Sequence, residues 1–311
     1  MSLALATKRD GSPLNLPGEP PFSGEDLEGI GGEIFQLPCE DPWILGEPDK
    51  AHAYLQGAKA GWSDHPEWMD FLDDESPISD LKSAERDIYL HWWKPWLDAE
   101  RVLDVACGIG RFTQPFLDRG ATVIGIDADV KSLRRCAWHA AGRPGKLDLH
   151  WTSVHKLPEE RGFDVAVAAE VLCYVPDVAP ALAAIRERLK VGGALLISME
   201  ARWGWAASQD APAGAIEAAL DGDGVVDVDS ERWVQTYTGE SFTQLLEDAG
   251  FTVERMVPAL YVLDGPLEDV GLTSTSLEEL LAIEERCRNH PVWKPLNRAW
   301  IAVAIRTEGS R

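Results

Sequence analysis

A short turn of small residues, followed by an acidic residue, is the first candidate site in the sequence. Asp104 and Ala106 come just before Gly108 and Gly110, and Asp127 lies 17 residues after Gly110. Small residues let the backbone approach a ligand closely, and a carboxylate can accept two hydrogen bonds from the hydroxyls of a ribose. The residue types and their spacing therefore indicate a site for a ligand that carries a ribose.

Parallel strands are the elements that must position these residues, and the sequence predicts such strands. Apolar runs predict strands over 101–106, 121–127, 147–151, 163–169 and 193–199, with helices over 110–120, 129–141 and 179–190 between them. Unbroken apolar strands that alternate with helices are typical of a parallel sheet covered on both faces. The alternation loosens after residue 200, and it resumes with a helix over 240–250 and strands over 251–257 and 298–305.

The charge of the chain is concentrated in its flanks. The 311 residues carry a formal net charge of −23. Residues 1–100 hold 21 acidic and 7 basic side chains, residues 101–200 hold 12 and 13, and residues 201–311 hold 19 and 9. Of the 13 tryptophans, 11 lie in the two flanks. A field this negative repels phosphate backbones and anionic lipids, so we expect neither nucleic acid nor a membrane as a partner.

Hydrophobicity and cysteine usage narrow the class of protein further. Hydrophobic residues make up 45% of the chain and charged residues 26%, as in ordinary globular proteins. No apolar run approaches the roughly 18 residues needed to cross a bilayer, and the N-terminal residues do not follow the pattern of a signal peptide. The five cysteines form no CxxC pair, which argues against a disulfide framework and a structural zinc site. We therefore expect a cytoplasmic protein without a bound metal.

Five segments, in order along the chain, resemble the class I S-adenosylmethionine (AdoMet)-dependent methyltransferases, in particular the group of the quinone-biosynthesis methyltransferases. These segments are VLDVACGIGRFT (102–113), VIGIDAD (123–129), HKLPEERGFDVAVAAEVLCYVPD (155–177), LKVGGALLIS (189–198) and YTGESFTQLLEDAGF (237–251). The resemblance implies an α/β fold with a Rossmann-like, seven-stranded, mostly parallel sheet. It further implies an antiparallel last strand, helices on both faces and an N-terminal helical cap. The implied cofactor is AdoMet, with S-adenosylhomocysteine as the product.

The same resemblance implies which residues bind the cofactor. The residues that would line the methionine end are those of the turn: Asp104, Ala106, Gly108 and Gly110. Asp127 would hold the ribose hydroxyls and Ala128 would lie against the adenine. Ser153 stands where relatives commonly have an Asp that contacts the adenine amino group, and the backbone amide of Val154 could meet the ring.

Two residues after the fourth predicted strand are the preferred catalytic candidates. In the family pattern Glu170 faces the sulfonium region, so it counts as both a cofactor-binding and a catalytic candidate. Tyr174 stands where many relatives have His, which leaves open which residue serves as the base. Further candidates for a base are His139, His155, Glu200, Tyr237 and Tyr261.

The flanks are the segments that would build the acceptor site in this fold. We expect an acidic N-terminal arm and helical cap over 1–80, followed by an AdoMet-binding domain over 81–311 with acceptor-cap insertions at about 201–238 and 263–297. An aromatic cap excludes water and can face a cation. We expect Trp62, Trp203, Trp233 and Tyr237 to contact a small, partly apolar acceptor, although most tryptophans in proteins are core residues.

Several alternatives stay open at this point. A nicotinamide-dependent dehydrogenase would also use a glycine turn and an acid, but position 113, where its third glycine belongs, is Thr113. A cyclase that uses AdoMet without methyl transfer, a non-catalytic partner subunit and a peptide methyltransferase share the same motifs. Among these we expect methyl transfer to the oxygen, nitrogen or carbon of a small molecule, in bacterial specialised metabolism.

Overall fold

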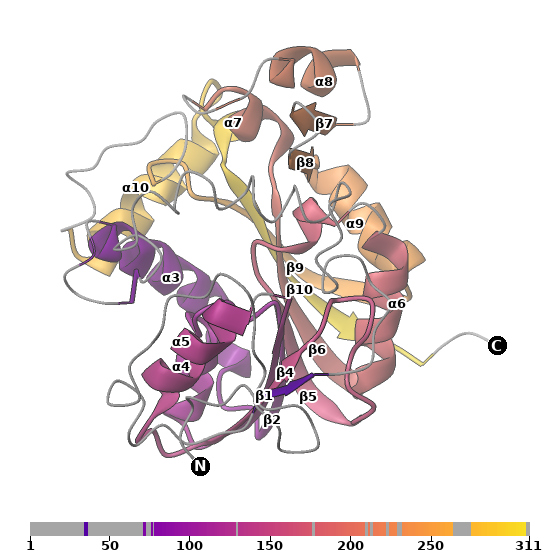
Figure 1. The fold of residues 1–311 in the computed structure, drawn as a ribbon. Helices are drawn as coiled ribbons and strands as arrows, with labels where there is room; N and C mark the ends of the chain where they lie inside the picture. Colours follow the sequence, from indigo (N-terminus) through magenta and orange to yellow (C-terminus); the bar gives the residue numbers. More distant parts are fainter. Residues whose placement is uncertain are drawn as a thin grey trace.

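A computed structural model shows the protein as a central sheet covered by helices (Figure 1). The structure describes residues 34–36, 71–72, 76, 78–128, 130–175, 178–208, 211, 214–221, 224–228, 232–263 and 275–308. Most of the predicted N-terminal arm and cap over 1–80, including Trp62, lies outside these residues.

The described residues form one sheet of eight strands in the order β1-β4-β3-β2-β5-β6-β10-β9. The parallel strands are β1 (Ile34–Gln36), β2 (Arg101–Val105), β3 (Thr122–Asp127), β4 (Lys146–Trp151), β5 (Phe163–Ala168) and β6 (Leu189–Glu200). The last strand, β10 (Ala299–Arg306), runs antiparallel to both β6 and β9 (Phe251–Ala259). The seven-stranded, Rossmann-like fold with an antiparallel last strand is therefore confirmed, and β1 adds an eighth strand beside β4.

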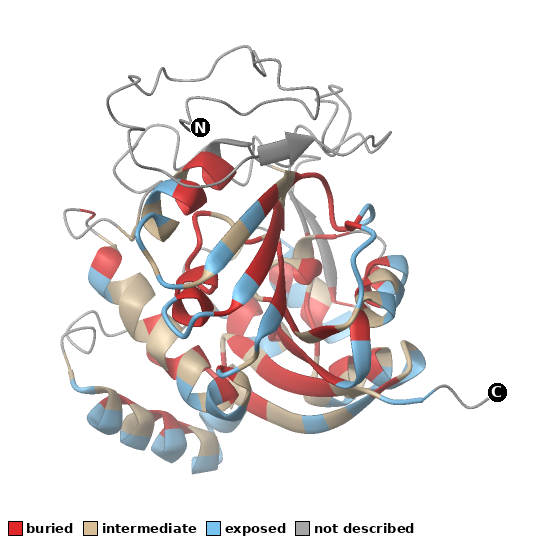
Figure 2. Cartoon of the chain, turned by 90° about the horizontal axis from the view of Figure 1, so that it is seen from below, coloured by how far each residue is buried: buried red, intermediate tan, exposed pale blue. Residues whose placement is uncertain are grey.

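Helices cover both faces of the sheet. One face packs against α6 (Val178–Arg188) and α9 (Gly239–Asp248) through a cluster that includes Ile185 and Phe242. The other face packs against α3 (Ser79–Trp93), α4 (Thr113–Leu117) and α10 (Leu277–Asn289). The next helix, α5 (Val130–Ala140), contacts α4, β3 and β4. Figure 2 shows the resulting pattern, with buried strands inside and helices that are exposed along their outer sides.

Helix α3 forms because its buried residues recur at helical spacing. Glu85, Ile88, Tyr89 and Trp93 lie on the face that meets the sheet. Three of the four are apolar, and Glu85 is a fully buried acid. A carboxylate in that position requires a partner, because burying an unpaired charge is costly. Glu85, the polar member of this buried face, leads to the candidate site.

The start of strand β6 differs from the sequence prediction near Gly192 and Gly193. We expected a turn before a strand that starts at residue 193, but β6 already begins at Leu189. The pairing with β5 shifts register between Phe163 and Val165, and Gly192 has a positive φ of 78°. An added side chain at Gly193 would come within 3.0 Å of the Phe163 carbonyl. The two glycines therefore form an irregularity within the strand instead of a separate turn.

Two segments extend beyond the ends of β6 and β9. The first contains α7 (Arg202–Ala206), α8 (Ala215–Asp221) and the antiparallel pair β7 (Val225–Val228) and β8 (Arg232–Gln235), all near the top of Figure 1. The second leads through α10 and a 3-10 turn over Lys294–Leu296 to β10. These segments correspond to the two predicted insertions, whose role as an acceptor cap remains a proposal.

Candidate functional site

The glycine turn after β2 is held in a conformation that suits small residues. Ala106, Gly108 and Gly110 all have positive φ, at 57°, 54° and 96°. The amide of Cys107 donates to the Ile126 carbonyl at 2.8 Å, and this bond ties the turn to β3. An added Cβ on Gly108 would have no atom within 4 Å. The backbone at Gly108 therefore has open space beside it, which would allow a ligand to lie close.

Gly110 differs from Gly108 because α5 lies against it. A Cβ on Gly110 would lie 3.0 Å from Cys136 Sγ, whereas one on Gly120, which also has positive φ, would meet nothing within 4 Å. We expect Gly110→Ala to destabilise the fold by about 2 kcal/mol and Gly120→Ala by about 1 kcal/mol, because only the first adds a close contact to backbone strain. Urea unfolding of the two variants measures the difference, and equal losses would contradict a tight packing of α5 on the turn.

Asp127 and Asp104 flank this turn from the ends of β3 and β2. Asp127 Oδ2 accepts a hydrogen bond from the Gly108 amide at 2.8 Å. Asp104 Oδ2 accepts one from the Thr113 hydroxyl at 2.5 Å. Burial raises the pKa of Asp104 to about 7, with the Thr113 hydrogen bond opposing the shift and the Asp127 charge adding to it. Asp104 is thus a carboxyl whose ionisation would be favoured by a nearby cation.

The residues expected to meet an adenine lie together at the ends of β3 and β4. Trp151 Nε1 donates to the Ala128 carbonyl at 2.9 Å, which fixes the backbone just after Asp127. Ser153 and Val154 are buried and lie two and three residues after the end of β4. Ser153 Oγ accepts from the His155 amide at 3.2 Å, within a turn closed by Lys156. The structure therefore brings Ala128, Ser153 and Val154 to the sheet edge that also carries Asp127.

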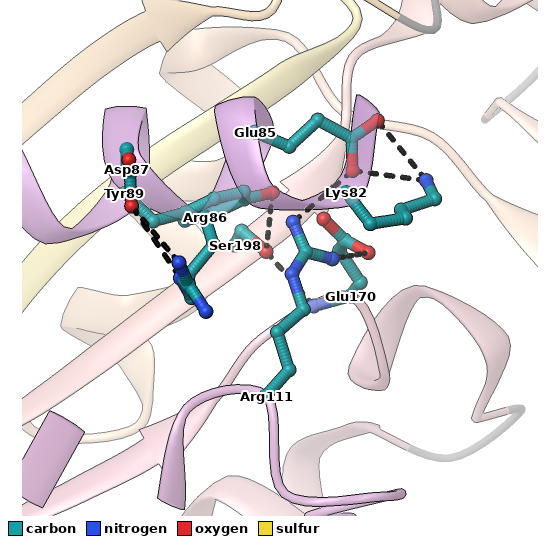
Figure 3. Close-up of polar contacts among 8 residues, drawn as sticks. All are labelled: Lys82, Glu85, Arg86, Asp87, Tyr89, Arg111, Glu170 and Ser198. Atoms are coloured by element: carbon teal, nitrogen blue, oxygen red, sulfur yellow. Dashed lines mark hydrogen bonds and ion pairs between the residues drawn. The ribbon is translucent and has the colours of Figure 1, made fainter. Parts of the chain in front are cut away.

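Glu170, just after β5, belongs to a buried ion-pair network that connects it to α3 (Figure 3). Arg111 donates to Glu170 from Nη1 and to Glu85 from Nη2, each at 3.1 Å. Lys82 Nζ donates to both oxygens of Glu85, at 3.0 Å to Oε1 and at 2.9 Å to Oε2, the oxygen that Arg111 also binds. The Arg111 guanidinium also lies 5.7 Å from the centroid of the Tyr89 ring. The network joins the helix before the sheet, the glycine turn and the tip of β5.

The environment of Glu170 keeps its carboxylate ionised. Burial alone would raise its pKa, but the charges of Arg111 and Lys82 outweigh burial and hold the pKa at about 2. Its backbone has a positive φ of 55°, and its amide donates to Ser198 Oγ at 2.9 Å. Glu170 is thus a fixed negative charge beside the glycine turn, which suits electrostatic stabilisation of a cation better than proton uptake.

Tyr174, in the 3-10 turn over Leu172–Tyr174, faces a second polar cluster. Its hydroxyl donates to Glu200 Oε1 at 2.9 Å, and the other oxygen of Glu200 is paired with Arg298. Glu200 is the last residue of β6, so it lies beside the tip of β5. The two catalytic candidates Glu170 and Tyr174 are therefore at the same sheet edge, each with its own charged partners.

The expected acceptor-contacting residues have different surroundings. Trp203 on α7 is 38% exposed, whereas its neighbour Trp205 is buried against Ala215 and Val234. Tyr237 is buried in the main core, and burial raises the pKa of its hydroxyl. For Trp233 the structure describes the backbone in β8, and Trp62 lies outside the described residues. Contact between any of these residues and an acceptor stays a prediction.

The sequence reading missed Arg111, Glu85 and Lys82. Arg111 lies 26 residues from Glu85 and 59 residues from Glu170 in the sequence. No local sequence pattern therefore connects Arg111 to either carboxylate. One signal was available, because a charged residue directly after Gly110 occupies a position that the fold buries.

In the described part of the chain no cluster of three His, Cys, Asp or Glu could hold a metal ion. No helix in that part has the length and hydropathy to cross a membrane.

Comparison with known proteins decides the family. A model of the methyltransferase domain matches residues 64–255, which is more than half of the chain. The chain belongs to this methyltransferase family. The match covers α3, the glycine turn and strands β2 to β6, which are the elements that build the site described above. The resemblance seen in the five sequence segments is confirmed at this level.

Individual relatives in this family share only part of the chain. A ubiquinone biosynthesis O-methyltransferase from a Bradyrhizobium species is 31% identical over 102 residues, 33% of this chain and 40% of the relative. The human mitochondrial ubiquinone biosynthesis O-methyltransferase is 29% identical over 61% of this chain and 52% of its own. The chain thus matches about half or less of these relatives. The crystal structure of magnesium protoporphyrin IX methyltransferase from Synechocystis, with bound SAH, shares the fold at 14% identity and a TM-score of 0.53, covering 83% of this chain and 100% of that one.

A further buried carboxyl, Glu284 on α10, fixes the start of the second insertion. Its Oε1 accepts from the Tyr261 and Val262 amides at 2.7 and 3.3 Å, just after Leu260 with its positive φ of 58°. Its Oε2 has no hydrogen-bond partner among the described residues. Burial raises its pKa from 4.5 to about 7, although these backbone donors and Arg288 oppose the shift. Glu284 is therefore more easily protonated in the folded methyltransferase than in the unfolded chain.

The raised pKa of Glu284 predicts a pH-dependent effect on stability. A carboxyl that binds its proton more tightly when folded stabilises the fold at low pH, and this contribution is lost as pH rises from about 4.5 to about 7. Glu284→Gln, which is neutral at every pH, should gain about 2 kcal/mol over the native chain between pH 5 and pH 8.5. Urea unfolding at both pH values measures this gain. A stability difference that does not vary with pH would contradict it.

Proposed function

We propose that this methyltransferase transfers a methyl group from AdoMet to a small, partly apolar metabolite. The observation that supports this most is the combination at Gly108. Its backbone is open to a ligand, and its amide is bound to Asp127 at 2.8 Å, so the turn and a ribose-binding acid are held together. The family match to residues 64–255 adds methyl-transfer chemistry to that geometry.

The residues present fit AdoMet at each of its three parts. Asp127 retains acceptor capacity for ribose hydroxyls, since a carboxylate offers about four lone-pair sites. Ala128, Ser153 and Val154 form the wall next to it, where the adenine would lie. Asp104, with its pKa of about 7, would be drawn into its ionised form by the methionine ammonium group. AdoMet, when bound, supplies an electrophilic methyl group on a sulfonium.

The chain's own residues would position that group and the acceptor. Glu170 places a fixed negative charge where a sulfonium cation would be stabilised, and Arg111 keeps this carboxylate in place. Tyr174 lies at the same edge and packs against the first insertion, so it is the better candidate to contact an acceptor. Holding the acceptor atom close to the methyl carbon can by itself supply much of the rate enhancement. The two insertions would then exclude water, as an acceptor cap does.

The proposal is tested by calorimetry with AdoMet and by an assay of labelled methyl transfer to a panel of small metabolites. We expect one AdoMet to bind per chain and label to appear in a metabolite. Binding without transfer to any panel member would instead favour a cyclase or a non-catalytic partner. Transfer to peptides in place of small molecules would favour a peptide methyltransferase, and the absence of binding would contradict the proposal.

A further inference from the structure

We propose that Glu200, held by Arg298, orients the Tyr174 hydroxyl so that its oxygen receives the proton of an acceptor O–H or N–H group. The site would then take acceptors that carry such a hydrogen and would disfavour carbon, thioether and tertiary-amine acceptors. This inference rests on the proposed methyl transfer and names the substrate class of the same site.

Two contacts in series hold the hydroxyl of Tyr174. It donates to Glu200 Oε1 at 2.9 Å, and Arg298 pairs with Glu200 Oε2. The side chains of Glu200 and Arg298 are 6% and 14% exposed, so both charges are shielded from water. A carboxylate bound to a guanidinium is ionised and cannot donate a proton, so the hydrogen between Tyr174 and Glu200 belongs to the phenol. The phenol oxygen accordingly presents its lone pairs away from Glu200.

The backbone around Glu200 makes this orientation rigid. Glu200 lies opposite Ala299 in the pairing of β6 with β10. The Tyr237 amide donates to the Glu200 carbonyl at 2.9 Å, and the Ala201 amide donates to the Arg298 carbonyl at 3.0 Å. These bonds fix the backbone of both charged residues independently of their side chains. The carboxylate therefore behaves as a fixed anchor for the phenol.

The positions of the three residues in the chain connect this anchor to the acceptor side. Tyr174 follows β5, Glu200 directly precedes the first insertion, and Arg298 directly follows the second. The Tyr174 ring packs both against the main core and against the cluster of Trp205, Ala206, Ala215, Ala219 and Val234 in the first insertion. The first insertion and the tip of β5 thus meet at the Tyr174 side chain, and Arg298, next to the second insertion, is connected to it through Glu200.

The chemistry of methyl transfer explains why such a weak base suffices. Bonding of the methyl group to an O–H or N–H atom makes its hydrogen strongly acidic, so the accepting group need only be correctly placed. Tyr174 Oη takes that hydrogen as a proton while its own proton passes to Glu200 Oε1. The acceptor atom gains the methyl group, and the sulfur keeps the electron pair of the broken carbon–sulfur bond and becomes a neutral thioether. Glu200 returns its proton to solvent after the products leave.

Glu170 and Tyr237 are less suited to this role. Arg111 binds one oxygen of Glu170 at 3.1 Å, and the charges of Arg111 and Lys82 hold the pKa of Glu170 at about 2 against the effect of burial. Tyr237 is buried in the main core, with its ring centroid 5.8 Å from that of Phe242. Tyr174 is only partly buried, and the geometry therefore points to it as the group that contacts the acceptor.

The first test uses binding and does not depend on turnover. The probes are catechol, which carries O–H groups, and 1,2-dimethoxybenzene, which has the same shape without them. Calorimetry measures the Kd of each probe for the protein saturated with S-adenosylhomocysteine. We expect Tyr174→Phe and Glu200→Gln each to weaken catechol binding about tenfold, because one oriented hydrogen bond is lost, and to leave dimethoxybenzene binding unchanged.

The second test follows catalysis in the same variants. Labelled AdoMet is offered with catechol, 4-hydroxybenzoate and phenethylamine, and separately with thioanisole and N,N-dimethylbenzylamine, which have no O–H or N–H. We expect label only in the first group, and kcat about 100-fold lower in Tyr174→Phe and Glu200→Gln. Glu200→Asp, which keeps the carboxylate, should recover part of the loss. The double variant should be no slower than either single variant, since the two residues act as one unit.

Controls separate this inference from the proposed function. AdoMet affinity and the Tm of each variant report whether the fold and the cofactor site are intact, and we expect AdoMet affinity within twofold of the native value. Failure of the native chain to bind AdoMet would overturn the proposed function and the inference with it. Intact AdoMet binding with unchanged catechol affinity and kcat in both variants, or with methyl transfer only to the second group of acceptors, would overturn the inference alone. Transfer to none of the acceptors would contradict the proposed methyl transfer and the inference with it.

Discussion

Replacing Asp127 by Ala is expected to weaken AdoMet binding by about 100- to 1000-fold. The side chain has two functions that the substitution removes together. It would accept hydrogen bonds from two ribose hydroxyls, and bonds to a charged acceptor contribute about 1.5–3 kcal/mol each. It also accepts the Gly108 amide at 2.8 Å, which would lose its partner in the variant. Two such bonds at the lower end of this range, about 3–4 kcal/mol together, correspond to the stated loss of affinity, which calorimetry with AdoMet measures directly.

Two matched variants sharpen the test of Asp127. Asp127→Asn keeps one acceptor oxygen and should lose affinity by an intermediate amount. Asp98→Ala removes an acid from the surface, where its side chain is 92% exposed, and should leave affinity unchanged. An Asp127→Ala variant that folds and binds AdoMet as tightly as the native chain would contradict the placement of the ribose at this residue.

Replacing Arg111 by Met is expected to destabilise the fold by about 3 kcal/mol. The guanidinium is 8% exposed and binds Glu85, which is 1% exposed, as well as Glu170. Its removal leaves the buried carboxylate of Glu85 with Lys82 as its partner and the partly exposed Glu170 without its bond to Arg111. Breaking a buried pair typically costs about 3–5 kcal/mol, and the partial exposure of Glu170 keeps the expected loss at the lower end of this range. Urea unfolding measures the loss, which should be visible as a lower transition midpoint.

A more exposed ion pair on the same helix, Arg86 with Asp87, provides the control for Arg111. Arg86 and Asp87 lie 3.4 Å apart with side chains 25% and 45% exposed (Figure 3). Arg86→Met should cost less than about 1 kcal/mol, because water screens an exposed pair. Adding Glu85→Gln to Arg111→Met should restore part of the lost stability, since it removes one of the uncompensated charges. Equal losses for Arg86→Met and Arg111→Met would contradict a buried, coupled network.

Local sequence patterns were sufficient to predict the sheet and to place the glycine turn and Asp127 at the ends of its strands. The strands are nearly unbroken apolar runs, and the turn at Gly108 and Gly110 uses residues within one short segment, so adjacent positions carry the signal. The position of Asp127 could be predicted in the same way, because it is the last residue of the next predicted strand. The short strand β1 was not predicted, because three residues beside β4 leave no periodic pattern in a segment rich in Gly, Pro and acid.

The charged networks could not be predicted because they join distant segments. Glu85 and Arg111 meet only after α3 packs beside the glycine turn, and Tyr174 meets Glu200 across two neighbouring strands. Composition predicted the tryptophan-rich flanks but not which rings are exposed, and Trp203 and Trp205 on one short helix differ in this respect. The tertiary structure determines which of these side chains meet and which are buried, and the residue types alone do not predict this.

The central claim is that the turn at Gly108 and the carboxylate of Asp127 bind AdoMet. The most direct measurement is a calorimetric titration of AdoMet into the native chain, with Asp127→Ala titrated in parallel. We predict one bound AdoMet per native chain and a binding signal that is almost lost in the variant. A native chain that shows no binding, or a folded variant that binds equally well, would contradict the claim.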